Sequence, residues 1–507
     1  MHVGYMYDKI VAMEMPNTKK IKDTKDTSII KNIDDLASTE LRGDALNILE
    51  AGYEAIVTEK VVKDFVSVKG DIMHVKNKAS DINLSDYKRV FFIGIGKCAF
   101  DAGVVFEKML GEKITDGIII DVKGGTLKKL HSHVGTHPLP SEENVAVTRS
   151  IVELIKGTTE EDLVVVVISG GGSSLLCLPH EMNCEALSRI TEALMKKGAT
   201  ITELNTVRKH LSEIQGGQFA KLVYPSSVIS FVFSDVPGND IGVIASGPTV
   251  LDRTTKEDAE AILAKYDVLK VCVTPECKVL ETPKDRKYFK NVENILVLTN
   301  LNALVAMESK ARELGYMASI ASDSLQGEAR ETGVTLVEKL KGRKKRCMLY
   351  GGETTVTFSE KSDTEKEGDD NAVTEEKTTE STEKKTVKQQ EEGEKKDGEK
   401  NDTGDAEEEN KKAKGGRNQE AALGALTTIP EGVVFVAAAS DGWDNSDVAG
   451  VIADSVLFEE SKRLKLEVQE YLDTHNSYEF FKKAGGHIKT GRLGSNVSDL
   501  YFVLSQK

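Results

Sequence analysis

The sequence predicts an α/β fold made of more than one domain. Short runs rich in β-branched residues alternate along the chain with segments of helical spacing. Several of these runs are apolar on both faces, as strands of a parallel sheet are when helices cover both sides. The chain has 507 residues, which is more than one hydrophobic core usually serves. We therefore expect two α/β domains.

The expected strands follow from the apolar runs. They are 89–96, 116–122, 163–170, 228–236, 294–300, 347–356 and 432–442. Segments between them, such as 185–198 and 301–315, have the spacing of amphipathic helices. The stretch 271–291 is weakly patterned and contains both prolines and charges, so we place the domain boundary there.

One internal segment differs sharply in composition. Residues 359–414 contain 20 acidic residues and 12 Lys, with no aromatic residue, Leu or Ile. Such a segment cannot bury enough apolar surface to offset the entropy lost on ordering. We expect a disordered acidic insertion, more plausibly an inert surface loop than a regulatory element, because long loops add little closure entropy.

Composition also excludes several classes of protein. The net charge is −15, which repels nucleic acid and leaves no basic stripe for it. No apolar run approaches the roughly 18 residues of a membrane span. Six scattered cysteines fit a reducing compartment, and the first twenty residues lack the features of a secretory signal or a mitochondrial presequence. A cytoplasmic location is expected, ahead of a mitochondrial one.

The first candidate site follows the strand at 89–96. Gly94, Gly96 and Ala99 satisfy the pattern G-x-G-x-x-A, and Asp121 stands about where a ribose-binding acid would. A dinucleotide site is therefore a real alternative. Lys97, directly after the second glycine, could instead meet a phosphate at a helix start, or be an ordinary solvated residue.

Further strand ends carry glycine, hydroxyl and carboxylate groups. After the third run the chain reads ISGGGSSLL, a candidate anion cradle formed by Ser169, Gly170, Gly171, Gly172, Ser173 and Ser174. The expected strand at 228–236 is followed by a segment with Asp235 and Asp240. These carboxylates could hold a divalent cation, or one could act as a base, although a turn alone would also favour aspartate there. A fourth supplies Asp441, Asp444 and Asp447, whose spacing does not close an EF-hand.

Basic side chains sit on two expected helices. Arg208 lies in NTVRKHLSEIQGG and could donate two hydrogen bonds to a carboxylate or phosphate. A solvated amphipathic helix would also account for an arginine at this position. Arg417 opens a helix after Gly415 and Gly416, again an anion-binding geometry. The segment HSHVGTHPLP contains His131, His133 and His137, but its H-x-H pair comes without an evident further ligand set, so a zinc site is not expected.

Nine segments in the same order resemble those of the MOFRL-type glycerate 2-kinases. They are GIGK, GTHPLPSEENV, ISGGGSSLL, NTVRKHLSEIQGGQFA, SDVPGNDIGVIASGPT, GGETTV, GGRNQE, SDGWDNSDVAG and TGRLGSNVSDLYF. The resemblance runs from about residue 40 to the C-terminus, interrupted only by the acidic insertion. Trp443 and Asn445 stand where smaller residues are more usual in the family.

The resemblance implies transfer of the γ-phosphoryl group of ATP to the 2-hydroxyl of D-glycerate, with Mg²⁺. It also implies two α/β domains facing across a cleft, the first Rossmann-like with a mostly parallel sheet. The expected divisions are an N-terminal extension at 1–35, a first domain at 36–275 and a second at 290–507. A monomer or homodimer is expected, with no nucleic-acid or membrane partner.

Three residues fall on the family's cleft positions: Lys97, Asp235 and Arg417. Chemistry suggests that the two cations neutralise the transferring phosphoryl group, while Asp235, or Asp240 as second choice, accepts the hydroxyl proton or holds Mg²⁺. Arg208 would pair with the glycerate carboxylate. Second-rank candidates for metal, substrate or nucleotide contacts are His137, Glu353, Asp441, Asn496 and Asp499.

Two alternatives stay open at this point. One is an NAD(P)H-dependent hydroxypyruvate reductase, which would use the G-x-G-x-x-A segment and Asp121 but would leave the SGGGSS and GGRNQ segments without a role. The other is a catalytically idle binding protein that uses its charged insertion.

Overall fold

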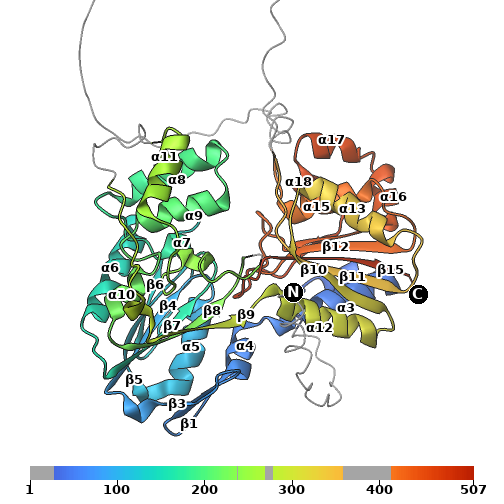
Figure 1. Cartoon of the computed structure of the whole chain (residues 1–507). Coiled ribbons are helices and arrows are strands. Elements are labelled where there is room, and N and C mark those ends of the chain that lie inside the picture. The colour runs from blue at the N-terminus through green and yellow to red at the C-terminus, as the bar shows by residue number, and fades with distance from the viewer. Residues whose placement is uncertain (1–27, 237, 269–277, 358–412, 507) are drawn as a thin grey trace, which may run out of the picture.

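A computed structural model describes residues 28–236, 238–268, 278–357 and 413–506 of the chain. It has two lobes, each built around a six-stranded sheet (Figure 1). Most of the predicted acidic insertion and part of the weakly patterned stretch lie outside the described residues. The two-domain α/β prediction is confirmed.

The first lobe contains a wholly parallel sheet. Its strand order is β6 (Leu130–Val134), β5 (Ile114–Asp121), β4 (Arg89–Ile95), β7 (Asp162–Ile168), β8 (Ser227–Phe233) and β9 (Val292–Leu298). This is the Rossmann order, because the chain starts in the middle at β4, runs outward to β6 and then returns to β7. The direction of winding therefore reverses between β4 and β7, where ligands of such sheets bind.

Helices cover this sheet and explain its apolar strands. Every residue of β7 is buried, as expected for a central strand with both faces covered. Helix α5 (Ala99–Leu110) packs on one face, and α6 (Glu142–Lys156), α7 (Gly172–Leu175) and α10 (Gln218–Val223) pack on the other. Helices α8 (Cys184–Lys196), α9 (Ile201–His210) and α11 (Lys256–Lys265) pack on one another in a separate cluster at one end of the lobe (Figure 1). A small antiparallel sheet, β1 (Val66–Lys69), β2 (Ile72–Val75) and β3 (Ile82–Asn83), follows helix α4 (Thr58–Phe65).

The second sheet is mixed. Its order is β10 (Met317–Leu325), β11 (Arg346–Gly352), β15 (Asp499–Ser505), β12 (Val433–Ala439), β13 (Gly450–Asp454) and β14 (His487–Ile488). Only β10 and β11 pair in parallel, and the other neighbours are antiparallel. Its helices are α12 (Asn300–Glu313), α13 (Ala329–Leu340), α15 (Arg417–Leu426), α16 (Ser455–Arg463), α17 (Val468–Asp473) and α18 (Ser477–Ala484).

The boundaries between the lobes differ from the predicted division into 36–275 and 290–507. Strand β9, which the predicted boundary assigns to the second domain, pairs with β8 in the first sheet. Helix α3 (Glu40–Ala55), predicted to be in the first domain, packs against α12 beneath the second sheet (Figure 1). Arg42 forms a buried ion pair with Asp454, and the Tyr53 hydroxyl donates to the carbonyl of Ala439 at 3.1 Å. These long-range contacts leave no signature in local periodicity.

All seven predicted strands correspond to observed ones, and the two predicted helices correspond to α8 and α12. Strands β6 and β10 were missed because their sequences, LHSHV and MASIASDSL, are polar and partly exposed. Strand β15 is fully buried and reads DLYFVLS, so its apolar run was a signal that could have been used.

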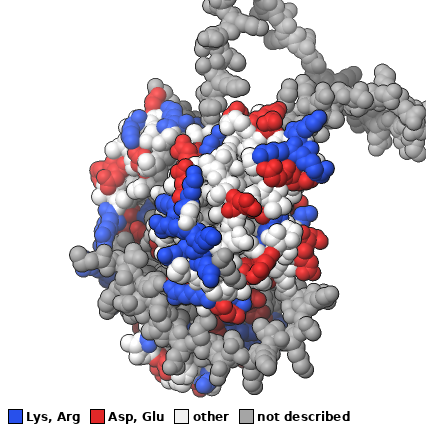
Figure 2. Space-filling model, turned by 90° about the vertical axis from the view of Figure 1, so that its right-hand side faces the viewer, with Lys and Arg blue, Asp and Glu red and all other residues white. Residues whose placement is uncertain are grey.

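Charge is unevenly distributed over the surface. Five of the six residues 341–346 are Lys or Arg and all six are exposed, and Figure 2 shows Lys and Arg gathered on one area of this side of the molecule. The chain therefore has a local basic cluster despite its net negative charge, because a net charge does not say where charges gather. Among the described helices, none is long and apolar enough to cross a membrane.

Candidate active site

A cleft of about 1150 Å³ lies between the lobes. The first lobe contributes Lys97, Gly171 and Asp235, and the second contributes Glu353, Arg417 and Asp441. The first-lobe residues follow the carboxyl ends of β4, β7 and β8, the edge at which open α/β sheets bind ligands. The structure thus brings together the three residues predicted to be catalytic.

Two glycine-rich loops form the floor of the cleft at the β4–β7 switch point. The Lys97 amide donates to the Gly170 carbonyl at 2.9 Å, and the Ser169 amide donates to the Ile95 carbonyl at 2.9 Å. Gly96 has φ +110°, and a Cβ there would lie 2.3 Å from the Ser169 hydroxyl. Ser169 is buried and accepts a hydrogen bond from the Cys98 amide at 3.2 Å. Its observed contacts are structural.

Asp235 packs against the second of these loops. A Cβ on Gly170 would lie 2.1 Å from Asp235 Oδ2, so only glycine allows the carboxylate to approach this closely. Burial raises the pKa of Asp235 to about 6, with Asp441 also raising it and Lys97 and Arg417 lowering it. Cations from both lobes therefore act on the same half-buried carboxylate.

Lys97 and Asp441 connect the two lobes directly. Lys97 Nζ lies 3.5 Å from Asp441 Oδ2, and both side chains are about four-fifths buried. Asp441 follows β12 and also accepts a hydrogen bond from the Trp443 amide at 3.1 Å. This contact holds the ammonium group of Lys97 in the cleft.

Arg417 is the first residue of α15 and is held by two carboxylates. Its guanidinium lies 2.9 Å from Glu353 and also pairs with Asp499 through Nε. These partners raise the pKa of Arg417, while burial raises the pKa of Glu353 to about 7 against the opposing effect of Arg417. Asp499 is buried, so the arginine neutralises charge that would otherwise be costly.

Asp444 fixes the start of this helix. Its carboxylate accepts hydrogen bonds from the backbone amides of Asn418 and Gln419 at 3.1 and 2.9 Å. A Cβ on Gly416 would lie 2.1 Å from Asp444 Oδ1, which explains the glycine before Arg417. A carboxylate at a helix start satisfies amides that have no partner within the helix. Asp444 therefore positions Arg417.

His137 and Asn496 also line the cleft. His137 is accessible to solvent, yet desolvation by the surrounding walls, followed by Lys97 and Arg492, lowers its pKa to about 4. The ring is therefore neutral near pH 7. Asn496 accepts a hydrogen bond from the Ser498 amide at 3.2 Å.

Of the predicted anion cradle, only Gly171 is among the residues that line the cleft. Gly172 packs against Ala245. Ser173 exchanges a hydrogen bond of 3.0 Å with Ser246, and Ser174 donates to the carbonyl of Pro138. The two serine hydroxyls thus stabilise neighbouring loops.

Two further predicted residues are not among those lining the cleft. Asp240 is exposed and accepts a hydrogen bond from the Gly242 amide at 2.8 Å, which is turn chemistry. Arg208 lies on α9, where burial lowers its pKa. Within the described ranges, no three His, Cys, Asp or Glu residues cluster as a metal site would require.

Asp121 is occupied by backbone hydrogen bonds. It is fully buried and accepts hydrogen bonds from the amides of Phe100 and Val122 at 2.9 and 2.6 Å. The carboxylate thus satisfies the start of α5 and does not present itself to a ribose. This geometry disfavours the dinucleotide interpretation.

Sequence reasoning missed Lys123 and Arg492, both of which line the cleft. Lys123 pairs with Asp101 at 2.6 Å, and the Arg492 guanidinium lies 4.0 Å from the ring centroid of Trp443. Arg492 belongs to the TGRLGSN segment, one of the nine that resemble the family. The positive charge of Arg492 within this segment was a signal from which the sequence analysis could have identified it.

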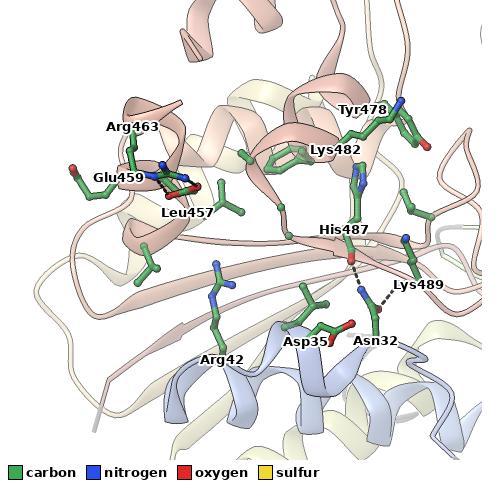
Figure 3. A pocket seen from close by; sticks show the side chains of 18 of the residues that line it. Asn32, Asp35, Arg42, Leu457, Glu459, Arg463, Tyr478, Lys482, His487 and Lys489 are labelled. Carbon is green, nitrogen blue, oxygen red and sulfur yellow. Dashed lines mark hydrogen bonds and ion pairs between the residues drawn. The ribbon is translucent and has the colours of Figure 1, made fainter. Parts of the chain in front are cut away.

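A second pocket of about 820 Å³ lies beside α16 and α18 (Figure 3). Asn32 bridges the carbonyl of His487 and the amide of Lys489, each at 2.9 Å (Figure 3). Its arginines are already paired, Arg42 with Asp454 and Arg463 with Glu460. Unlike the cleft, this pocket has no Gly-rich loop from the carboxyl end of the parallel sheet among its described lining residues.

The comparisons with known proteins agree with the geometry. Residues 44–280 match a domain of unknown function (DUF4147), and residues 398–499 match the MOFRL family. A protein named D-glycerate 2-kinase from Thermotoga maritima is 32% identical, covering 90% of this chain and 96% of its own length. A crystal structure of glycerate kinase from the same organism has a TM-score of 0.71 at 30% identity, covering 91% of this chain and 98% of its own.

One relative bears a different name. A protein called putative hydroxypyruvate reductase, from Agrobacterium vitis, is 30% identical and covers 82% of this chain and 87% of its own length. That name coincides with the alternative that Asp121 disfavours. The breadth of the match to the kinases, together with the MOFRL segment, shows that the chain belongs to the MOFRL-type glycerate 2-kinase family.

Proposed function

We propose that this protein is a glycerate 2-kinase, which transfers the γ-phosphoryl group of ATP to the 2-hydroxyl of D-glycerate to give 2-phosphoglycerate and ADP. The observation that carries the proposal is the placement of Lys97 and Arg417, from opposite lobes, in one cleft around Asp235. A terminal phosphate in this cleft would meet positive charge from both lobes.

In the proposed reaction, the 2-hydroxyl oxygen attacks the γ-phosphorus and the bond to the β–γ bridging oxygen breaks. Asp235 accepts the hydroxyl proton at a carboxylate oxygen, for which a pKa of about 6 is well matched. Lys97 and Arg417 neutralise the charge on the transferring group, and ADP leaves with the bridging oxygen. The protein thus contributes positioning and electrostatic stabilisation.

Asp441 is the first candidate to hold a magnesium ion that arrives with the nucleotide, and Asp235 would join it only if another group accepts the hydroxyl proton, because a metal-bound carboxylate is a weak base. Asp235 and Asp441 interact electrostatically, and Mg²⁺ is usually bound by one or two carboxylates together with phosphate oxygens. Bound there, the ion would neutralise charge on the β- and γ-phosphates. Asp240 does not join this pair, so it is the weaker of the predicted metal candidates.

The remaining proposed substrate contacts depend on which residues line the cleft. Gly171, Thr136 and His137 form the first-lobe wall beside Lys97 and would contact substrate. Arg208 was expected to bind the glycerate carboxylate, but it is not among the cleft-lining residues. We also propose a cytoplasmic location, which the buried free thiols of Cys98, Cys177, Cys184 and Cys347 support.

The test is to incubate the pure protein with D-glycerate, ATP and Mg²⁺ and to measure ADP formation. Phosphorus NMR of the product then distinguishes the 2-phosphate from the 3-phosphate. A parallel incubation with hydroxypyruvate and NADH tests the reductase alternative. Oxidation of NADH without formation of ADP would overturn the proposed function.

A further inference from the structure

The cations lining the cleft differ in whether a carboxylate already holds them. Lys97 pairs with Asp441 at 3.5 Å, Lys123 with Asp101 at 2.6 Å and Lys414 with Glu479 at 3.3 Å. Arg417 pairs with two carboxylates. For Arg492, no ion pair with a described carboxylate is seen. Among the cations that line the cleft, Arg492 therefore has the most N–H groups available to bind an incoming anion.

Arg492 is nevertheless held in place by an aromatic ring. Its guanidinium lies 4.0 Å from the ring centroid of Trp443, which is 39% exposed. Stacking of this kind restricts the orientation of the planar guanidinium group. The indole covers one face of the guanidinium, while the N–H groups at its edges can still donate.

The stacked pair is tied to the centre of the cleft through Asp441. The Trp443 amide donates to Asp441 Oδ1 at 3.1 Å, and the amide of Leu493, next to Arg492, donates to the Asp441 carbonyl at 2.8 Å. Both members of the stack are thus anchored on the residue that pairs with Lys97. The positive charge of Arg492 also acts on His137, on the opposite wall.

We propose that Arg492, oriented by Trp443, binds an anionic group of a substrate, either a phosphate of the nucleotide or the carboxylate of glycerate. A planar guanidinium can donate two parallel hydrogen bonds to either group. The identity of these two anions rests on the proposed function, whereas the presence of an anion site does not. Trp443 is a positioning residue, because it acts through Arg492.

The chain has one tryptophan, so intrinsic tryptophan fluorescence reports on this stack alone. We expect ADP, inorganic phosphate or D-glycerate, each titrated separately, to change the emission of the wild-type protein. A response to ADP and phosphate assigns the site to the nucleotide, and a response to D-glycerate assigns it to the carboxylate. No change with any of the three would overturn the proposal.

Kinetics of Arg492→Gln provide the second readout. We expect KM to rise at least tenfold for the substrate identified by fluorescence and to change less than twofold for the other. Arg492→Lys keeps the charge but loses the planar guanidinium, so its KM should lie between those of the wild-type protein and Arg492→Gln. The matched control is Arg343→Gln, which removes the same charge from an exposed position outside the cleft. Unchanged KM values in Arg492→Gln would refute the assignment.

A double substitution tests the positioning role. Trp443→Ala should raise the same KM as Arg492→Gln, by a smaller factor, and should add nothing to it in the double variant. Additive effects would refute action through Arg492. If the wild-type protein forms no ADP from glycerate, the proposed function fails, but the titrations with ADP and phosphate still decide whether Arg492 binds an anion.

Discussion

The amide of Lys97 donates a hydrogen bond of 2.9 Å to the carbonyl of Gly170, joining the loops that follow β4 and β7. These loops lie at the point where the winding of the sheet reverses, so the bond fixes the ammonium-bearing residue against the glycine loop. Gly170 in turn packs against Asp235. One backbone contact therefore sets the relative positions of a cation and the proposed base.

Gly170→Ala should lower kcat about 10- to 100-fold, because its Cβ would displace the Asp235 carboxylate. The KM for ATP should change little. Steady-state kinetics checks this, with Gly157→Ala as control, since a Cβ at Gly157 meets no atom within 4 Å. Wild-type kcat in Gly170→Ala would show that the close packing has no catalytic importance.

Lys97→Ala should lower kcat on the order of 100-fold or more, because it removes an oriented charge from the transferring phosphoryl group. Its effect on the melting temperature should be small, since the ion pair with Asp441 is long at 3.5 Å. Lys256→Ala removes an ion pair of the same length outside the cleft and serves as control. Turnover within threefold of wild type would remove Lys97 from the catalytic set.

Arg417 calls for a different substitution. Arg417→Ala would leave Glu353 and Asp499 without a cation between them. We expect the unfolding free energy to fall by about 1–3 kcal/mol. This is less than for a fully buried ion pair, because the arginine side chain is 34% exposed. This loss should shrink at low pH, where the carboxylates become protonated. Arg417→Lys should keep most of the stability and still lower kcat at least tenfold, because it loses the guanidinium fork. Chemical denaturation and kinetics together separate the two effects.

The pH dependence of turnover should follow Asp235. The carboxylate must be ionised to accept the hydroxyl proton, and its pKa is about 6. We therefore expect kcat to rise with pH between 5 and 7 and to level off above. Asp235→Asn should lack this ionisation and show a low, flat profile. A kcat that falls across this range would contradict the assignment of Asp235 as base.

Asp235→Asn should also stabilise the protein at high pH. Burial raises the folded pKa above the ordinary value of 3.8, so the folded protein bears a cost whenever the group is ionised. That cost is absent below about pH 4 and fully present above about pH 6. The melting temperature of Asp235→Asn should exceed that of wild type at pH 8, and the difference should vanish near pH 4. An equal difference at both pH values would point to packing instead.

Much of the site could be predicted from the sequence because its signals are local. Gly94, Gly96 and Lys97 adjoin an apolar strand, and the SGGGSS run follows another, so the sequence places both loops at strand ends, where open α/β sheets bind ligands. The predictions for Asp240 and Arg208 were weaker because nearness in the chain to a strand end does not determine the direction of a side chain. Asp240 turned out to stabilise its own turn.

Local patterns were sufficient to predict the two α/β domains, seven of the strands and the motifs that became cleft walls, because hydrophobic period and glycine placement act over a few residues. Long-range packing places β9 in the first sheet, α3 in the second lobe, and Arg417 between Glu353 and Asp499. These outcomes depend on packing between residues up to several hundred positions apart, which no local pattern records.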